Sequence, residues 1–188
     1  MSIFLIAKIL WALTGLYWLV SAINVKKTLE REESLCRLFY LCFWLVGVLL
    51  IFTNDFPFPF LYKPLFPQNS MMQAIGLICT LAGLAFAIWG RASLGNNWSG
   101  RVTLKEGHEL ITHGPYAISR NPIYSGFLLG LCGAAFIEGL LKDLLGLVLL
   151  VIGMHLKIYR EERLMKQNFG ARYLAYMAKV SRLIPFIY

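Results

Sequence analysis

The chain is organised around the stretch His108-Glu-Leu-Ile-Thr-His-Gly-Pro-Tyr-Ala-Ile-Ser-Arg-Asn-Pro-Ile-Tyr-Ser-Gly126, which places polar, aromatic and turn-forming residues between segments made mostly of Leu, Ile, Phe and Gly. Polar groups inside hydrocarbon are costly and usually functional. We therefore expect this stretch to lie at one end of a set of apolar helices and to carry the site.

Composition indicates an integral membrane protein. Hydrophobic residues make up 58% of the 188 residues and the mean hydropathy is +0.62, which is too apolar for a soluble domain of this length. The formal net charge of +8 does not indicate nucleic-acid binding, because no Lys/Arg cluster is interleaved with stacking aromatics outside the apolar segments. The three His and four Cys lack metal-ligand spacing, so we expect no metal and read the cysteines as reduced packing residues.

Apolar segments long enough to form membrane-spanning helices predict an all-α, polytopic membrane protein with about five spans, at residues 3–25, 38–53, 71–89, 123–137 and 140–158. The first is too long for a signal-peptide core, and no A-x-A cleavage site follows it. Residues 54–70 are rich in Pro and aromatics, which favours a loop at the membrane surface. The tail predicts a helix leaving the membrane, a break near Gly170, a short helix and a stop at Pro185.

The distribution of basic residues predicts the orientation. With five alternating spans, most of the 18 Lys and Arg fall on one side, together with the central stretch and the tail, and only Lys63 and Lys142 fall opposite. The positive-inside rule then puts the site and the C-terminal helices in the cytoplasm and the N-terminus on the other side.

Three patterns in the C-terminal half resemble a known family. They are Gly114-Pro-Tyr-Ala-Ile-Ser-Arg-Asn-Pro-Ile-Tyr-Ser-Gly126, then Glu161-Glu-Arg-Leu-Met-Lys-Gln-Asn-Phe-Gly-Ala-Arg-Tyr-Leu-Ala-Tyr176, and Arg182-Leu-Ile-Pro185. The chain is similar to the short prokaryotic-type members of the isoprenylcysteine carboxyl methyltransferase family, with the signature G-x-Y-x-x-x-R-H-P-x-Y-x-G, E-E-x-L, F-G-x-x-Y-x-x-Y and R-x-x-P. The resemblance covers Leu94 to Pro185.

This resemblance implies an S-adenosylmethionine pocket built by residues 94–126 and 157–185, and a lipophilic methyl acceptor reached from the bilayer. The carboxylate of a prenylated cysteine is the first expectation for that acceptor. The positions that match the family's cofactor contacts are His108, Glu109, Leu110, Ile111, Tyr116, Asn121, Pro122, Ile123, Tyr124 and Glu161.

The sequence departs from the family pattern at two positions. Asn121 replaces the usual His, and its amide can form hydrogen bonds but cannot titrate, which argues against acid/base chemistry there. Lys157 stands where the family has an Arg that faces the acceptor's carboxylate, and an ammonium lacks the bidentate fork of a guanidinium.

Helical spacing selects the candidate catalytic residues. Lys157, Arg160 and Glu161 lie at i, i+3 and i+4 and therefore share a face, while Glu162 points to the side. We therefore expect Glu161, rather than Glu162, to serve the site. A carboxylate acceptor is already ionised near neutral pH and needs no base, whereas an amine acceptor would make Glu161 the candidate proton acceptor.

Structural interpretations of the same residues remain open. Arg120 is compatible either with a role in the site or with pairing to lipid headgroups. Tyr173 and Tyr176 favour packing at the interface over cofactor contact. Glu161 and Glu162 are also compatible with a solvated ion-pair face.

Three alternative functions also remain. Phospholipid amine N-methylation is the alternative within methyl transfer. An NADPH-dependent membrane reductase of the sterol type would need R-x-P-N-Y-x-G-E, but Ile123 and Phe127 occupy the Asn and acid positions. A non-catalytic membrane interaction protein draws support from Asn121 and Lys157.

Overall fold

The computed structural model describes residues 2–23, 34–95, 98, 110–185 and 187. Within these ranges the chain is helical, and a single isolated bridge between Pro64 and Leu140 is the one strand-like pairing. The helices are α1 (Ile3–Ser21), α2 (Ser34–Phe52), α3 (Ser70–Leu94), α4 (Pro122–Glu138), α5 (Leu141–Phe169) and α6 (Ala171–Met177), with 3-10 turns η1 (Pro59–Tyr62) and η3 (Gly114–Ala117). The predicted all-α class is confirmed.

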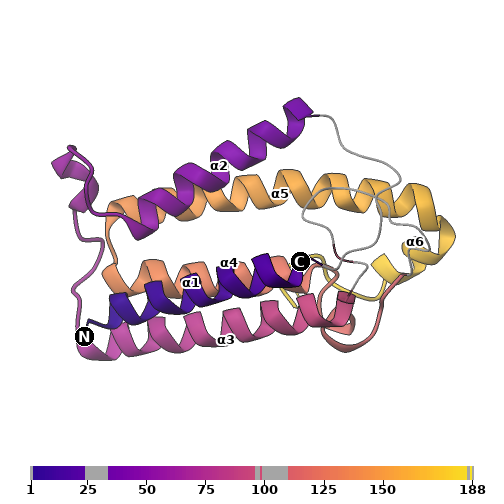
Figure 1. Ribbon diagram of the computed structural model, residues 1–188, viewed down its shortest axis with the longest axis horizontal. Helices are drawn as coiled ribbons and strands as arrows, with labels where there is room; N and C mark the ends of the chain where they lie inside the picture. The colour runs from indigo at the N-terminus through magenta and orange to yellow at the C-terminus, as the bar shows by residue number, and fades with distance from the viewer. Residues whose placement is uncertain (1, 24–33, 96–97, 99–109, 186, 188) are drawn as a thin grey trace.

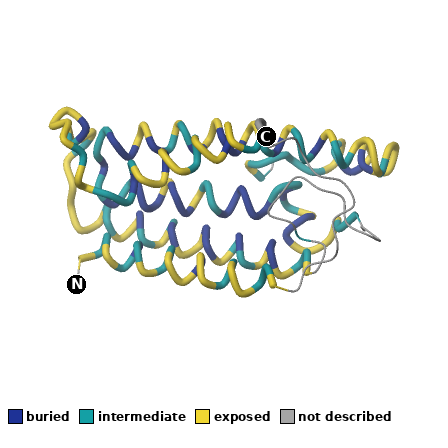
Figure 2. The backbone as a smooth tube through the Cα atoms, turned by 45° about the horizontal axis from the view of Figure 1, so that its top comes forward, coloured by how far each residue is buried: buried dark blue, intermediate teal, exposed yellow. Residues whose placement is uncertain are grey.

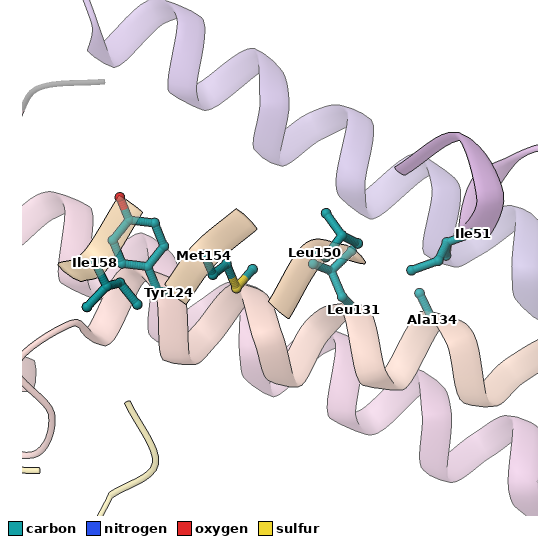
Figure 3. Close-up of a cluster of buried hydrophobic side chains, with 7 residues drawn as sticks. All are labelled: Ile51, Tyr124, Leu131, Ala134, Leu150, Met154 and Ile158. Atoms are coloured by element: carbon teal, nitrogen blue, oxygen red, sulfur yellow. The ribbon is translucent and has the colours of Figure 1, made fainter. Parts of the chain in front are cut away.

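The long helices form two groups that run along the same axis (Figure 1). In one group α3 packs along the whole of α4, and α1 lies against both helices. In the other group α2 packs along α5. The core lies where α4 and α5 face each other, and Figure 3 shows it extending from Tyr124 and Ile158 at one end to Ile51 and Ala134 at the other.

Glycines allow α3 and α4 to approach closely. A Cβ on Gly126 would lie 2.5 Å from both the amide nitrogen of Ala87 and the carbonyl oxygen of Gly83. Thr80 is fully buried, and its hydroxyl donates to the carbonyl oxygens of Gly76 in its own helix and Gly130 in α4. Backbone contact of this kind is the recognised use of small residues in membrane helix pairs, and burial is concentrated along α4 in Figure 2.

A buried charge cluster closes the end of the bundle where α4 turns into α5. Lys142 is fully buried, and its ammonium group lies 2.8 Å from Glu138 and 2.7 Å from Asp143. The same ammonium donates to the carbonyl oxygens of Leu50 and Ile51 near the end of α2. Lys142 therefore ties α2 to the α4–α5 turn.

Each predicted span overlaps one of the helices α1 to α5, but the bounds differ: α1 ends at Ser21 rather than at residue 25, and α2 begins at Ser34 rather than at residue 38. α3 continues to Leu94, beyond the predicted end at residue 89, so Arg91 is a buried helical residue. The prediction that the last span continues as a helix to a break near Gly170 is confirmed: α5 runs to Phe169, and Gly170, at φ +50°, is the first residue that leaves helical geometry. By length and composition α1 and α3 are able to cross a bilayer, while α4 is a shorter apolar helix. The number of spans and their orientation stay predictions.

Candidate active site

The central stretch turns sharply before α4. Gly114 has φ +61°, η3 follows it, and Pro122 occupies the first turn of α4, where its missing N–H costs nothing. The hydroxyl of Ser119 reaches the hydroxyl of Ser125, at 2.9 Å, across this turn. The turn places Asn121 and Tyr124 at the end of the bundle where α5 leaves the core.

Four residues from three helices meet at this end, and we call them the Glu161 cluster: Tyr40, Tyr124, Lys157 and Glu161. The hydroxyl of Tyr124 donates to Oε1 of Glu161 at 3.0 Å. The ammonium of Lys157 is 3.8 Å from the same oxygen and lies 5.6 Å from the centre of the Tyr124 ring and 5.8 Å from that of Tyr40. The predicted shared face of Lys157 and Glu161 is confirmed, and the pair is surrounded by aromatic rings.

A second set of contacts, the Glu162 network, is formed by Arg120, Asn121, Glu162 and Arg182. Glu162 accepts from Nε of Arg120 at 3.0 Å through one carboxylate oxygen. Nε and Nη2 of Arg182 donate to the other oxygen at 2.9 and 2.7 Å. The side chain of Glu162 is 2% exposed, so both carboxylate oxygens are satisfied within the protein.

The two guanidinium groups determine the ionisation of Glu162. Burial raises its pKa, but the hydrogen bond from Arg182, together with the charge and hydrogen bond of Arg120, outweighs burial and holds the pKa below its usual range. Glu162 is therefore a charged structural residue at neutral pH.

The C-terminal tail is fastened to the central stretch through backbone oxygens. Arg120 donates to the carbonyl oxygens of Met177 and Val180, at 3.1 and 2.5 Å. Asn121 donates from its side-chain amide to the carbonyl oxygen of Arg182 at 3.0 Å. The hydroxyl of Tyr176 donates to the carbonyl oxygen of Tyr116 at 2.5 Å. The tail therefore packs directly against the central stretch.

These contacts decide several of the open interpretations. Arg120 pairs with Glu162 and with the tail rather than projecting towards lipid headgroups. Tyr173 and Tyr176 are buried and pack against each other, with ring centres 5.9 Å apart. The reading of Glu161 and Glu162 as one solvated face is wrong for Glu162, because Arg120 and Arg182 cover it.

The remaining predicted cofactor residues are only partly brought together. Tyr116, Pro122 and Ile123 are buried next to the end of α3, and Leu110 and Ile111 are half-buried before η3. His108 and Glu109 lie outside the described residues. Arg160 is half-buried, and no contact with the Glu161 cluster is recorded for it in the described part of the chain.

Sequence reasoning missed Arg91 and the structural role of Glu162. Nothing in the local pattern marks Arg91, since it follows an apolar helix directly and reads as the first residue of a polar segment. For Glu162, the signal was present in Arg182-Leu-Ile-Pro185, because a distant Arg needs an acid partner when buried. In the described part of the chain, no group of three or more His, Cys, Asp or Glu side chains is placed to hold a metal ion.

Comparisons with known proteins identify relatives of this chain. A sequence profile of the family described as phospholipid methyltransferase matches residues 71–172. A probable protein-S-isoprenylcysteine O-methyltransferase of Oryza sativa subsp. indica is 30% identical over 132 residues, which cover 65% of this chain and 68% of that protein. Protein-S-isoprenylcysteine O-methyltransferase B of Arabidopsis thaliana is 26% identical over 179 residues, which cover 93% of this chain and 87% of that protein.

A solved structure shares the fold. It is that of the eukaryotic intramembrane Ras methyltransferase, an isoprenylcysteine carboxyl methyltransferase, without a monobody, and it matches with a TM-score of 0.54 and 24% sequence identity. The match covers 83% of this chain but only 54% of that one, so this chain spans about half the length of the solved protein. The profile match and the plant relatives together show that this chain belongs to the phospholipid methyltransferase family of enzymes and, within it, resembles the protein-S-isoprenylcysteine O-methyltransferases.

Proposed function

We propose that this protein is a multi-pass membrane methyltransferase that transfers the methyl group of S-adenosylmethionine to the carboxylate of a prenylated cysteine or a similar lipid-like acid. The observation that carries this proposal is the Glu161 cluster, a carboxylate and an ammonium held among tyrosine rings where α5 leaves the core. The plant relatives support the acceptor, because their names specify an isoprenylcysteine.

The residues present fit a sulfonium cofactor. When bound, S-adenosylmethionine supplies an electrophilic methyl group on a sulfonium, so the protein mainly has to align the partners and exclude water. The Glu161 carboxylate and the rings of Tyr116 and Tyr124 are the kinds of groups that attract a cation in a partly dry site. Asn121 is held by the tail and donates hydrogen bonds, so its substitution for the family's His preserves a polar contact without a titrating group.

Lys157 is suited to hold the acceptor. Its ammonium lies over the rings of Tyr40 in α2 and Tyr124 in α4, which places a positive charge beside an aromatic surface. A carboxylate with an isoprenoid tail matches both features, because its negative charge suits the ammonium and its apolar tail suits the aromatic rings. We assign Arg160 to the same helical face as a second contact for the acceptor, as its spacing predicts.

The proposed function includes an orientation of the protein in the membrane. We infer five spans, formed by α1 to α5, with the Glu161 cluster, the central stretch and the tail facing the cytoplasm, on the basis of the distribution of Lys and Arg. Several exposed large hydrophobic residues on α1 and α2, such as Leu19, Val20 and Leu45, are suited to contact lipid.

Phospholipid amine methylation is the second candidate, because the matching family profile is described as phospholipid methyltransferase. An amine must lose a proton before it attacks, and Glu161 would accept that proton. The two candidates therefore differ in the need for a base. The family assignment favours methyl transfer over both the reductase and the non-catalytic interpretations.

The decisive experiment supplies methyl-labelled cofactor to the purified protein in vesicles. One arm contains a prenylcysteine, and the other contains phosphatidylethanolamine. We expect label in a base-labile methyl ester in the first arm, and loss of that label in Glu161→Gln. Label only in the phospholipid would establish the second candidate, and label in neither, with no binding of S-adenosylhomocysteine, would overturn the methyltransferase assignment.

A further inference from the structure

Arg91 is a buried cation near the end of α3. It is 3% exposed, and its guanidinium lies 4.4 Å from the centre of the Trp98 ring. Nη1 donates to the carbonyl oxygen of Gly95 at 2.9 Å, and Nη2 donates to the carbonyl oxygen of Ser21 at the end of α1. The contacts recorded for its terminal nitrogens are thus neutral backbone oxygens.

Among the residues that the structure describes, no carboxylate forms an ion pair with Arg91, and its Nε has no hydrogen-bond partner. A charge in a low-dielectric environment without a counter-ion is costly, as is an unpaired buried donor. The other buried charges in the described chain, Lys142, Asp143 and Glu162, have ion-pair partners. Arg91 therefore has the properties of a residue whose anionic partner is a ligand.

Arg91 borders the site through Tyr116. The hydroxyl of Tyr116 reaches the carbonyl oxygen of Gly90, at 3.5 Å, directly before Arg91 in the chain. Burial raises the pKa of Tyr116, the Glu161 carboxylate raises it further, and the Arg91 guanidinium acts in the opposite direction. Tyr116 is thus close to a negative group on α5 and a positive group on α3.

We propose that Arg91 binds the carboxylate of the amino-acid part of S-adenosylmethionine, while Glu161 faces the positive end of the same molecule. This inference rests on the proposed function. The cofactor carries a carboxylate, an ammonium and a sulfonium, so it requires a cation and an anion a short distance apart. Arg91 and Glu161 supply these charges, and both act electrostatically on Tyr116.

The test compares two ligands that differ in the amino-acid part. S-adenosylhomocysteine carries the carboxylate, and 5′-methylthioadenosine lacks it together with the ammonium. Calorimetry on the detergent-purified full chain should show that Arg91→Gln lowers the affinity for S-adenosylhomocysteine at least tenfold, which is the equivalent of one charge-assisted hydrogen bond. The affinity for 5′-methylthioadenosine should be unchanged. Arg163→Gln, at an exposed arginine on α5, is the matched control and should change neither affinity.

A second measurement needs no variant and holds even if Arg91→Gln fails to fold. The natural chain should bind the carboxamide analogue of S-adenosylhomocysteine at least tenfold more weakly than S-adenosylhomocysteine itself. Arg91→Lys, which keeps the charge but removes the guanidinium, should bind S-adenosylhomocysteine with an affinity between those of the natural chain and Arg91→Gln.

Four outcomes would overturn the inference. An equal loss of affinity for S-adenosylhomocysteine and 5′-methylthioadenosine in Arg91→Gln would assign Arg91 a structural role. Equal affinities of the natural chain for the carboxamide and the carboxylate would assign it the same role. Unchanged binding of S-adenosylhomocysteine in a folded Arg91→Gln variant would exclude the contact. If the natural chain binds none of these nucleosides, the proposed function itself fails and the inference fails with it.

Discussion

Adjacent acids on α5 have different environments and therefore different roles. The Glu161 side chain is 25% exposed and is in contact with a tyrosine hydroxyl and a lysine. Glu162 is 2% exposed and lies between two guanidinium groups. In the proposed site Glu161 contacts the ligand, whereas Glu162 fastens the C-terminal tail to α5 through Arg182.

Glu162→Gln should destabilise the protein by about 3–5 kcal/mol, because it leaves the charges of Arg120 and Arg182 without a counter-ion in a buried setting. Thermal unfolding in detergent measures the change. Glu161→Gln is the control, and its effect on stability should be much smaller because Glu161 is partly exposed. A loss of stability of similar size in Glu162→Gln and Glu161→Gln would contradict the structural role of Glu162.

Lowering the pH should remove the stabilisation that the Glu162 carboxylate gives to the folded protein. Because the pKa of Glu162 is lower in the folded state than in the unfolded chain, its stabilisation is present above the unfolded value of about 4.3 and is lost as the pH falls through the folded value. Unfolding midpoints measured between neutral and acidic pH should fall more steeply for the natural chain than for Glu162→Gln. Parallel curves would show that another acid carries the effect.

Lys157→Gln should raise the KM for a prenylcysteine acceptor by about tenfold and leave the affinity for S-adenosylhomocysteine unchanged, because one charge-assisted contact to the acceptor is lost. Lys157→Arg should retain or lower the KM, since a guanidinium binds a carboxylate through two hydrogen bonds. Lys166→Gln, at an exposed lysine on the same helix, serves as the control for steady-state kinetics. An unchanged KM in Lys157→Gln would assign the acceptor's carboxylate to another residue.

At the scale of elements, the pairing of α3 with α4 supports the site. Glycines on both helices bring the backbones into contact, and this contact places Pro122 and Ile123 against Gly90 at the site end. A Cβ on Gly90 would meet Ile123 at 3.1 Å. The position of the motif at the start of α4 therefore depends on helix packing tens of residues away in the sequence.

Gly126→Ala should destabilise the protein by about 1–3 kcal/mol or more, because the added Cβ overlaps the backbone of α3 and neither helix can yield by changing a rotamer. Gly15→Ala is the matched control: a Cβ there meets nothing within 4 Å, so the change should be neutral or stabilising by up to about 1 kcal/mol. Unfolding midpoints in one detergent provide the comparison. Equal midpoints for the two variants would contradict the tight α3–α4 contact.

At the scale of the whole molecule, the two ends of the bundle have different chemistry. The Lys142 cluster and the loop before α3 close one end, where Leu65 donates to Gly139 and Leu141 donates to Lys63. The Glu161 cluster and the tail occupy the other end, with α6 beside them (Figure 1). In the proposed orientation the two ends face opposite aqueous compartments.

The orientation can be tested by labelling single cysteines in a chain whose four natural cysteines are replaced by Ser. Asp55→Cys, in the loop before α3, should react with an impermeant maleimide from outside intact cells. Arg163→Cys, beyond the core on α5, should react only after permeabilisation. The reverse pattern would place the site outside the cytoplasm, and labelling of both from outside would contradict the odd number of spans between them.

The sequence by itself predicted the helical class, the approximate place of each long helix and the family. These features are local or compositional, because apolar runs, prolines, Gly170 and the motif at residues 114–126 are visible without knowledge of distant contacts. The pairing of Lys157 with Glu161 was also predictable, since both lie one helical turn apart.

Only the tertiary structure decided which acid is buried and which cation lacks a partner. Helical spacing assigned Glu162 to the side of the helix, but the tail folds back and supplies Arg182 from 20 residues away. Arg91 read as the start of a polar segment, yet the end of α1 and Trp98 enclose it. Burial of these charges results from contacts between segments far apart in the chain, and such contacts leave no local pattern in the sequence.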